Sequence, residues 1–353
     1  MKAIDEKYMA QCLLLAKGGR RLAMPNPSVG ALVVYNNKVI GEGSTSPYGE
    51  SHAEVHAINS VKDKSLLKKA KIYVTLEPCS HFGKTPPCID LILKHGIPTV
   101  IIGNKDPNEL VNGKGIEKLK SAGINVVENV LEKECYWLNR RFFTFHKHKR
   151  PYVILKWAQT KDGFIDKIRT ENEKGIFWIS NLETKELTHK WRAEEAAICV
   201  GTNTVDNDNP FLTVREVLGK NPLRIVIDRK LILKKNASVF NSDSSTLVLN
   251  EKLNSKIDNL EYITVDFNNL IQELMNILYK KNIMSVIIEG GKQTLQSFLN
   301  ENVWDEARVI SGNKRLNKGV GSPIIPISPN KSFYYGDDLV NIYNNTYKNE
   351  KFK

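Results

Sequence analysis

The chain has 353 residues, of which 41% are hydrophobic and 25% charged, a composition that excludes wholesale disorder. At roughly 100–200 residues per domain, the length predicts two domains. No apolar run reaches the roughly 18 residues that span a bilayer, and the amino terminus lacks the apolar core of a signal peptide. We therefore expect a soluble, cytoplasmic protein that does not bind membranes.

The formal net charge is +12, from 51 basic and 39 acidic residues. Such a surplus can indicate nucleic-acid binding, but the lysines are spread along the whole chain. This spread favours a biased codon usage or an anionic small substrate. The five cysteines are odd in number, and a chain of this length can form a core without disulfides, so a disulfide framework is not expected.

In the first part of the chain, strands alternate with helices, which is typical of an α/β fold with largely parallel sheets. Two apolar runs flank Asn36 and Asn37, and this pattern predicts a hairpin because asparagine tolerates positive φ. The expected strands are 30–35, 38–41, 71–76, 99–103 and 125–130, and the expected helices are 52–60, 88–95 and 115–122.

The segment 145–151 is polar and basic and ends in proline, which predicts an exposed linker. We therefore expect domains over residues 1–147 and 148–353. The second domain again alternates, with expected strands 152–158, 197–201, 223–228, 246–249, 285–289 and 307–311. Apolar residues between Asn269 and Lys281 follow helical spacing, whereas the polar tail after Ser328 gives no assignment.

One histidine and two cysteines have the residue types of a catalytic zinc site. The imidazole of His52 and the thiolates of Cys79 and Cys88 supply three ligands, which leaves the fourth tetrahedral position for a water that zinc activates. Glu54 would move the protons without binding the metal. A structural site in which His81 joins the cysteines is the alternative, but H-x-E followed by P-C-x(n)-C is typical of zinc nucleobase deaminases.

Further short motifs surround these residues. They are PNP at 25–27, VG at 29–30, EPCSHFGKTPPC at 77–88, GNKDPN at 103–108 and NGKG at 112–115. With HAE at 52–54, they resemble the bifunctional deaminase/reductase family of riboflavin biosynthesis, which shares the wide spacing between the cysteines. The chain departs from that family where Ser44 and Thr45 replace tyrosine and a histidine near the substrate phosphate.

The second half carries its own ordered series of motifs. They are LKWAQTKDG at 155–163, WIS at 178–180, GTNT at 201–204, DNPFLTVR at 208–215 and IEGG at 288–291. They resemble the reductase half of the same family, whose fold is similar to dihydrofolate reductase, and no GxGxxG motif supports a Rossmann site. The expected fold class is therefore α/β, with an N-terminal cytidine-deaminase-like three-layer domain and a C-terminal dihydrofolate-reductase-like domain.

The resemblance implies two reactions in riboflavin biosynthesis. The first is the zinc-dependent hydrolytic deamination of 2,5-diamino-6-(5-phosphoribosylamino)pyrimidin-4-one. The second is the NADPH-dependent reduction of the ribosyl group of 5-amino-6-(5-phosphoribosylamino)uracil to ribityl. It also implies one Zn²⁺ per chain, small phosphoribosyl pyrimidine substrates, no nucleic-acid partner and a homo-oligomer.

The resemblance also implies roles for individual residues. Zinc is assigned to His52, Cys79 and Cys88, with Glu54 catalytic. The residues assigned to NADPH are Ala158, Trp178, Thr204, Asp208, Gly291, Lys292, Gln293, Thr294, Leu295, Gln296 and Ser297. Glycines at 290–291 before a helix suit this role because they let the backbone approach a pyrophosphate. The residues assigned to the substrates are Asn26, Lys156, Arg192, Leu212, Arg215 and Glu289.

Two questions stay open at the level of the sequence. The reduction needs a proton donor, for which Lys156 and Asp162 are both candidates. Ile176 stands where serine is common in the family, so one substrate hydrogen bond is expected to be missing. The alternative functions are a tRNA adenosine deaminase with a C-terminal binding domain, against which the DNPFLTVR and EGG motifs argue, and a non-catalytic zinc scaffold, which would leave Glu54 unexplained.

Overall fold

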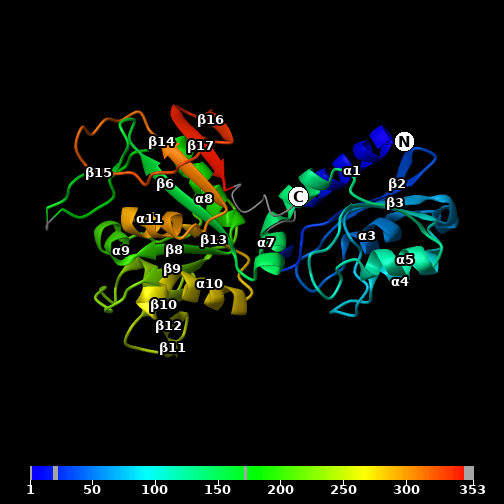
Figure 1. Ribbon diagram of the computed structural model, residues 1–353, viewed down its shortest axis with the longest axis horizontal. Helices are drawn as coiled ribbons and strands as arrows, with labels where there is room; N and C mark the ends of the chain where they lie inside the picture. Colours follow the sequence, from blue (N-terminus) through cyan, green and yellow to red (C-terminus); the bar gives the residue numbers. More distant parts are fainter. Residues whose placement is uncertain (1, 19–22, 171–172, 346–353) are drawn as a thin grey trace. The chain divides into compact units, whose positions relative to one another are not determined.

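The computed structural model describes residues 2–18, 23–170 and 173–345. They form two compact units that divide between residues 150 and 151 (Figure 1). Each unit contains its own sheet and its own buried apolar core.

The first unit is built on a five-stranded sheet with the order β2-β1-β3-β4-β5. Its strands are β1 (Gly30–Tyr35), β2 (Lys38–Ser44), β3 (Lys71–Leu76), β4 (Thr99–Asn104) and β5 (Asn125–Val127). Its helices are α1 (Lys2–Lys17), α3 (Ala53–Ser60), α4 (Cys88–His95), α5 (Lys114–Ser121), α6 (Glu132–Leu138) and α7 (Arg140–His148), with a 3₁₀ turn η1 (Lys64–Lys69). β1 pairs antiparallel with β2 and β3, whereas β3, β4 and β5 are parallel.

Helices cover both faces of this sheet, which gives three layers. α1 and α6 pack on one face, where Leu32 and Tyr73 meet Met9 and Leu138. Figure 1 shows α3, α4 and α5 on the other face. A Cβ at Gly43 would lie 2.3 Å from the carbonyl oxygen of Ala53, so glycine is required where α3 crosses β2.

Local signals predicted several of these elements at their observed bounds. Asn36 and Asn37 form the β1–β2 hairpin with φ of 46° and 57°, as their residue type predicts. β3 and α4 have the predicted bounds, and Gly96 ends α4 with φ 66°. The expected linker is helical as far as His148, because the three phenylalanines of α7 give that helix an apolar face that is buried, whereas residues 147–149 are exposed as expected.

The second unit contains a ten-stranded sheet with the order β11-β12-β10-β9-β8-β13-β6-β14-β17-β16. Its strands are β6 (Tyr152–Gln159), β8 (Ala197–Gly201), β9 (Leu223–Ile227), β10 (Thr246–Asn250), β11 (Ser255–Ile257), β12 (Leu260–Thr264), β13 (Ser285–Ile288), β14 (Glu306–Ser311), β16 (Lys331–Tyr335) and β17 (Asp338–Asn344). A separate pair consists of β7 (Phe164–Asp166) and β15 (Val320–Gly321). The strands from β12 to β14 run parallel, whereas β11, β16 and β17 pair antiparallel.

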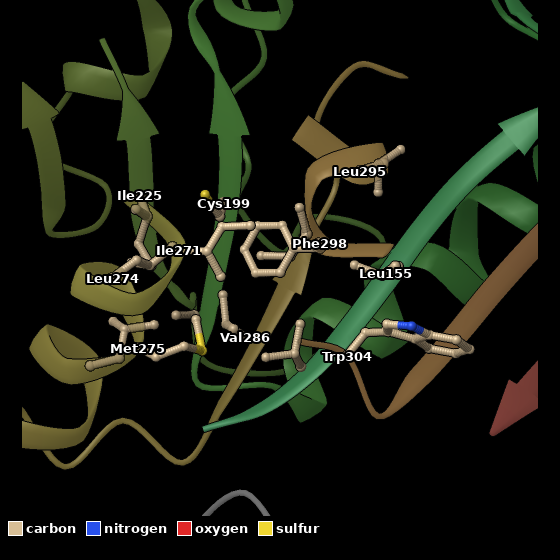
Figure 2. Packing of buried hydrophobic residues seen from close by; sticks show 14 of the residues in the cluster. Leu155, Cys199, Ile225, Ile271, Leu274, Met275, Val286, Leu295, Phe298 and Trp304 are labelled. Carbon is tan, nitrogen blue, oxygen red and sulfur yellow. The ribbon is translucent and has the colours of Figure 1, made fainter. Parts of the chain in front are cut away.

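Helices also cover both faces of the larger sheet. They are α8 (Leu182–Glu194), α9 (Thr202–Asp208), α10 (Leu270–Lys280) and α11 (Lys292–Asn300), with 3₁₀ turns η2 (Ser238–Phe240) and η3 (Phe267–Asn269). Figure 2 shows Cys199 and Val286 of the sheet against Leu274 of α10 and Phe298 of α11. α8 and α9 contribute Trp191 and the adjacent apolar residues to the cluster on the opposite face. Parallel strands buried on both faces explain the unbroken apolar runs that made these strands recognisable.

Candidate zinc site and cofactor cavity

The three predicted zinc ligands converge in the first unit. Their ligand atoms lie within 4.8 Å of one another. Among the described residues, the cluster of possible metal ligands contains His52 and does not contain His81. His52 Nδ1 lies 3.6 Å from Cys79 Sγ and 3.3 Å from Cys88 Sγ. A tetrahedral zinc with Zn–S of about 2.3 Å and Zn–N of about 2.0 Å places its ligand atoms about 3.5 Å apart. The donor set and its spacing therefore fit one zinc ion.

Three different elements position these ligands. His52 is the residue that precedes α3, Cys79 lies in the loop after β3, and Cys88 is the first residue of α4. The backbone N–H of Cys88 donates to Cys79 Sγ at 3.3 Å, as expected for a thiolate that faces a helix N-terminus. Hydrogen bonds with Cys88 and His52 hold the pKa of Cys79 well below its usual range. Both cysteines are free of disulfides.

Glu54 lies in the first turn of α3 and is 4% exposed. Burial raises the pKa of its carboxyl group, with the neighbouring Cys79 as a second cause. A carboxyl group in this environment holds a proton more readily than an exposed glutamate. The arrangement can therefore combine a metal ion with an adjacent proton carrier.

Glu77 also shapes this site, although it was not among the predicted site residues. Its buried carboxylate accepts four backbone N–H groups, from Asp106 (3.1 Å), Gly113 (2.9 Å), Gly115 (3.0 Å) and Ile116 (3.2 Å). These bonds tie the loop that carries Cys79 to the segment after β4 and to the first turn of α5. A glutamate directly after a buried strand was the available signal, because a buried carboxylate needs donors.

The neighbouring loops hold the other residues that were singled out in this unit. Asn26 lies in the turn before β1, where its N–H donates to the carbonyl of Ala23 at 2.8 Å. The Thr45 hydroxyl is bound to the backbone of Val29, at 2.9 Å from its nitrogen and 3.3 Å from its oxygen. Thr45 therefore supplies neither the charge nor an unengaged hydroxyl at the position of the family's histidine.

The second unit contains a cavity of about 1320 Å³ along the carboxyl ends of its parallel strands. Most of the residues predicted for the reductase line it. The lining cofactor residues are Ala158, Trp178, Thr204, Asp208, Gly291, Lys292, Gln293, Thr294 and Ser297, and the lining substrate residues are Lys156, Arg192, Leu212, Arg215 and Glu289. Leu295 and Gln296 do not line it, because helical spacing turns Leu295 into the core (Figure 2) and Gln296 towards Asn300.

A largely buried ion cluster lies in this cavity, with side chains that are 9–13% exposed. Arg192 binds the Glu289 carboxylate through Nη2 at 2.7 Å and Nε at 3.3 Å, and Lys156 Nζ lies 3.8 Å from Glu289 Oε2. Burial would raise the pKa of Glu289, but Arg192 and Lys156 outweigh it and lower this pKa to about 2. Burial lowers the pKa of Lys156, against the opposing effect of Glu289.

The second candidate for the proton donor has a different position. The Asp162 carboxylate accepts the N–H groups of Leu316 (3.0 Å) and Asn317 (2.8 Å) and the hydroxyl of Thr160 (2.6 Å). The hydrogen bond from Thr160 lowers the pKa of Asp162, and the residue does not line the cavity. Through these contacts, Asp162 stabilises the loop that follows β14.

The start of α11 fits the phosphates of a dinucleotide. A Cβ at Gly290 would lie 2.8 Å from Thr294 Cβ, so only glycine lets the backbone run this close to the helix. The unpaired N–H groups of the helix start and its dipole favour a phosphate there. Trp178, 50% exposed, and the apolar Ile176 line the same cavity.

Comparisons with known proteins agree with both sites. Residues 2–104 match the cytidine and deoxycytidylate deaminase zinc-binding region, and residues 151–321 match the RibD C-terminal domain. The riboflavin biosynthesis protein RibD of Aquifex aeolicus is 40% identical over 91% of this chain and 90% of its own length. That of Bacillus amyloliquefaciens is 39% identical over 86% and 83%. The chain belongs to the RibD family.

Solved RibD structures share the whole fold. A deaminase/reductase of Thermotoga maritima superposes with a TM-score of 0.87 at 35% identity and covers 97% of this chain and 99% of its own. RibD of Acinetobacter baumannii gives 0.87 at 27% identity, with coverage of 98% and 99%. The predicted cytidine-deaminase-like and dihydrofolate-reductase-like domains are thus confirmed. As a RibD protein, the chain is a bifunctional deaminase and reductase of riboflavin biosynthesis that uses zinc and NADPH. None of the described helices is long and apolar enough to cross a bilayer.

Proposed function

We propose that residues 1–147 carry out the deamination and residues 148–353 the reduction, on the two phosphoribosyl pyrimidines named above. The observation that carries this proposal is the convergence of His52, Cys79 and Cys88 within 4.8 Å beside the buried Glu54. Bound zinc would supply the Lewis acid that makes a water nucleophilic near neutral pH. His52, Cys79 and Cys88 would hold it, and the fourth position would take the water.

Glu54 is the proton carrier in this proposal. It accepts one proton from the attacking water and delivers it to the ring nitrogen. It then carries a second proton, from the hydroxyl group on the tetrahedral ring carbon, to the amino group, which leaves as ammonia while the carbonyl forms. Its raised pKa supports this role, because a carrier must exist in both protonation states during the reaction. Asn26 would hold the exocyclic groups of the pyrimidine. Lys84, whose Nζ lies 4.1 Å from the Tyr48 ring centroid, is the cation assigned to the phosphate in place of the family's histidine.

In the reductase cavity, the buried ion cluster would receive the pyrimidine. The Glu289 carboxylate stays charged and accepts hydrogen bonds from the substrate, while Leu212 packs beside it. Because Arg192 is engaged with Glu289, Arg215 is the better candidate for the substrate phosphate. Lys156 is the better candidate for the proton donor, since its lowered pKa makes its ammonium a stronger acid.

The cofactor would lie across the start of α11. The backbone of 291–294 holds the pyrophosphate, and Ala158 and Trp178 border the nicotinamide. Thr204 and Asp208 face the ribose. Arg169 Nη2 donates a hydrogen bond to Asp208 Oδ1 at 3.3 Å. The reduction transfers a hydride from the nicotinamide to C1 of the ribosyl group.

The remaining parts of the proposal concern the cellular context. We infer a homo-oligomer that acts in the cytoplasm without a nucleic-acid partner. The support is the family resemblance, together with five cysteines that form no disulfide. Light scattering of the purified chain tests the oligomeric state.

A two-substrate assay tests the assignment of the activities. With the diaminopyrimidinone substrate and NADPH, we expect ammonia release followed by an equal amount of nicotinamide oxidation. With the deaminated substrate, nicotinamide oxidation should proceed without ammonia. Deamination of a tRNA or DNA oligonucleotide without any nicotinamide oxidation would contradict the proposal.

A further inference from the structure

One arginine in the wall of the cavity, Arg169, has no part in binding the substrate or the cofactor as proposed above. It lies three residues beyond the end of β7. Its side chain is only 10% exposed, although it lines the cavity. A guanidinium that is removed from water needs partners, because an unpaired charge is costly to bury. The partners of Arg169 therefore indicate what it does.

Five oxygen atoms surround the guanidinium group of Arg169. The Asp166 carboxylate accepts hydrogen bonds from Nε at 2.7 Å and from Nη2 at 3.1 Å. Nη1 donates to the carbonyl oxygens of Gly175 at 2.7 Å and of Glu173 at 3.5 Å. Nη2 also donates to Asp208 Oδ1 at 3.3 Å. Because a guanidinium has five N–H groups, these acceptors engage all of them, and none is left for a phosphate or a substrate.

The carboxylate of Asp208 is engaged through one oxygen only. Asp208 is the last residue of α9, its side chain is 30% exposed, and it lines the cavity. Among the residues that the structure describes, Arg169 is the donor to this carboxylate, and Oδ2 accepts no hydrogen bond. A carboxylate that is fixed through Oδ1 presents Oδ2 in a defined direction. A hydroxyl group, such as those of a ribose, is a suitable donor for that oxygen.

The charge of Arg169 also acts on Asp208. Burial raises the pKa of Asp208 to about 6, Arg169 opposes this rise, and Asp166 adds to it. A carboxyl group accepts a stronger hydrogen bond when it is ionised. Arg169 therefore favours the protonation state of Asp208 that binds a hydroxyl group best, in addition to fixing its direction.

A second ion pair on the same loop gives a comparison. Lys174 pairs with Asp206 of α9, but these side chains are 48% and 52% exposed, and neither lines the cavity. The N–H of Gly175 also donates to the carbonyl oxygen of Asn207 at 2.7 Å. The loop is thus attached to α9 by contacts that do not involve Arg169. The less exposed pair of Arg169 with Asp208 is therefore not needed merely to attach the loop.

We propose that Arg169 is a positioning residue of the reductase, which keeps the Asp208 carboxylate ionised and directed at a ribose hydroxyl group of the cofactor. The inference rests on the assignment of Asp208 to the cofactor ribose, which is proposed above, and adds the residue that acts through it. Arg169 itself makes no contact with the cofactor. Its whole contribution to cofactor binding should therefore depend on the presence of the Asp208 carboxylate.

A double-mutant cycle tests this dependence. Binding of NADP⁺ to the full chain is measured by calorimetry, without any turnover. Asp208→Asn should weaken binding by roughly 10-fold, as expected for the loss of a charge-assisted hydrogen bond. Arg169→Gln should weaken binding by roughly 3- to 10-fold in the unaltered chain. In the Asp208→Asn chain, the same substitution should weaken binding by no more than about 2-fold, because the two effects are coupled.

The pH dependence of binding gives a second measurement. In the unaltered chain, the affinity for NADP⁺ should fall as the pH decreases below about 6, where Asp208 takes up a proton. In Arg169→Gln this fall should begin at a higher pH, because the cation that opposes protonation is gone. Arg169→Lys should return it towards the profile of the unaltered chain, since lysine keeps the charge. Titration of the ligand is common to all these proteins, so the difference between them comes from the chain.

Lys174→Gln is the matched control, as a cation of the same loop that pairs with the same helix outside the cavity. It should bind NADP⁺ as the unaltered chain does. Urea unfolding checks that each variant is folded, and Arg169→Lys replaces Arg169→Gln in the cycle if the latter is not.

Equal weakening by the Arg169 variant with and without Asp208→Asn would overturn the proposal, and so would an unshifted pH profile. Unchanged binding by the Arg169 variant, with weaker binding by Asp208→Asn, would overturn this inference alone. Unchanged binding by Asp208→Asn would overturn the ribose assignment as well.

Discussion

Two glutamates, one in each unit, are buried or nearly so and have carboxyl groups whose pKa values are shifted in opposite directions. Glu54 lies beside two thiols and its pKa is raised by burial, whereas Arg192 and Lys156 lower the pKa of Glu289 to about 2. Burial acts on both carboxyl groups alike, so the number of neighbouring cations decides the direction. The first group is suited to carry a proton and the second to remain charged.

The two sites also differ in how the chain builds them. The zinc ligands come from a short stretch, residues 52–88, and two of them begin or precede a helix. The ion cluster joins Lys156 of β6, Arg192 of α8 and Glu289 after β13, which only the sheet order brings together. We therefore expect the activity of the first site to depend on its metal, and the stability of the second site to depend on its charged side chains.

Removal of zinc should have the largest effect and separate the two sites completely. Chelation should abolish ammonia release, because no other group in the site activates water. The reductase should keep its rate with the deaminated substrate, since hydride transfer needs no metal. The measurement is ammonia release and nicotinamide oxidation on the same chelated sample, with zinc added back as the control. Loss of both activities would mean that zinc supports the whole fold.

Glu54→Gln should lower the rate of deamination by about 10²- to 10⁴-fold, the usual contribution of a general acid–base group. Zinc content, determined by metal analysis, should be unchanged, because Glu54 is not a ligand in our proposal. Stability in urea should stay the same or rise, as the variant no longer buries a carboxyl group. Glu50→Gln, an exposed glutamate of the same unit, is the control. Full deamination by Glu54→Gln would rule out Glu54 as the proton carrier.

The same comparison shows how much of the molecule could be predicted from its sequence. The hairpin at Asn36 and Asn37 and helix α4 follow from local patterns, and the structure contains them. The predicted zinc ligands also follow from a local pattern, and the structure brings the three side chains together. The strands β16 and β17 were missed because most of their residues are partly or fully exposed and give no apolar run; β16 forms the edge of the sheet and β17 lies next to it. The Arg192–Glu289 pair was missed because its two residues lie far apart in the sequence.

Glu289→Gln should destabilise the chain, in contrast to Glu54→Gln. The variant leaves the cations of Lys156 and Arg192 buried without their carboxylate, which costs about 3 kcal/mol in comparable buried pairs. The measurement is the urea dependence of unfolding, with Glu301→Gln, another glutamate that lines the cavity, as the control. Unchanged stability would mean that solvent reaches and screens the ion cluster.

The smallest expected effect is a pH dependence that comes from His189 of α8. This side chain is 2% exposed, and its Nδ1 accepts the backbone N–H of Arg215 at 2.9 Å. Burial, with Arg192 and Arg215 close by, lowers its pKa to about 4, against the opposing charges of Glu216 and Glu289. The unfolded chain takes up this proton below about pH 6.5, whereas the folded chain does so only near pH 4.

Because the unfolded state binds more protons between these two values, the free energy of unfolding should fall as the pH decreases from about 6.5 to about 4. Above about pH 6.5 both states are neutral at this residue, so His189 adds no slope there. His189→Gln keeps a hydrogen-bond acceptor for Arg215 but cannot titrate, and its stability should fall less steeply over the same range. Urea midpoints of both proteins across this range measure the difference. Parallel pH profiles would show that His189 is protonated alike in the folded and unfolded states. They would contradict the claim that His189 is neutral in the folded chain and accepts the N–H of Arg215.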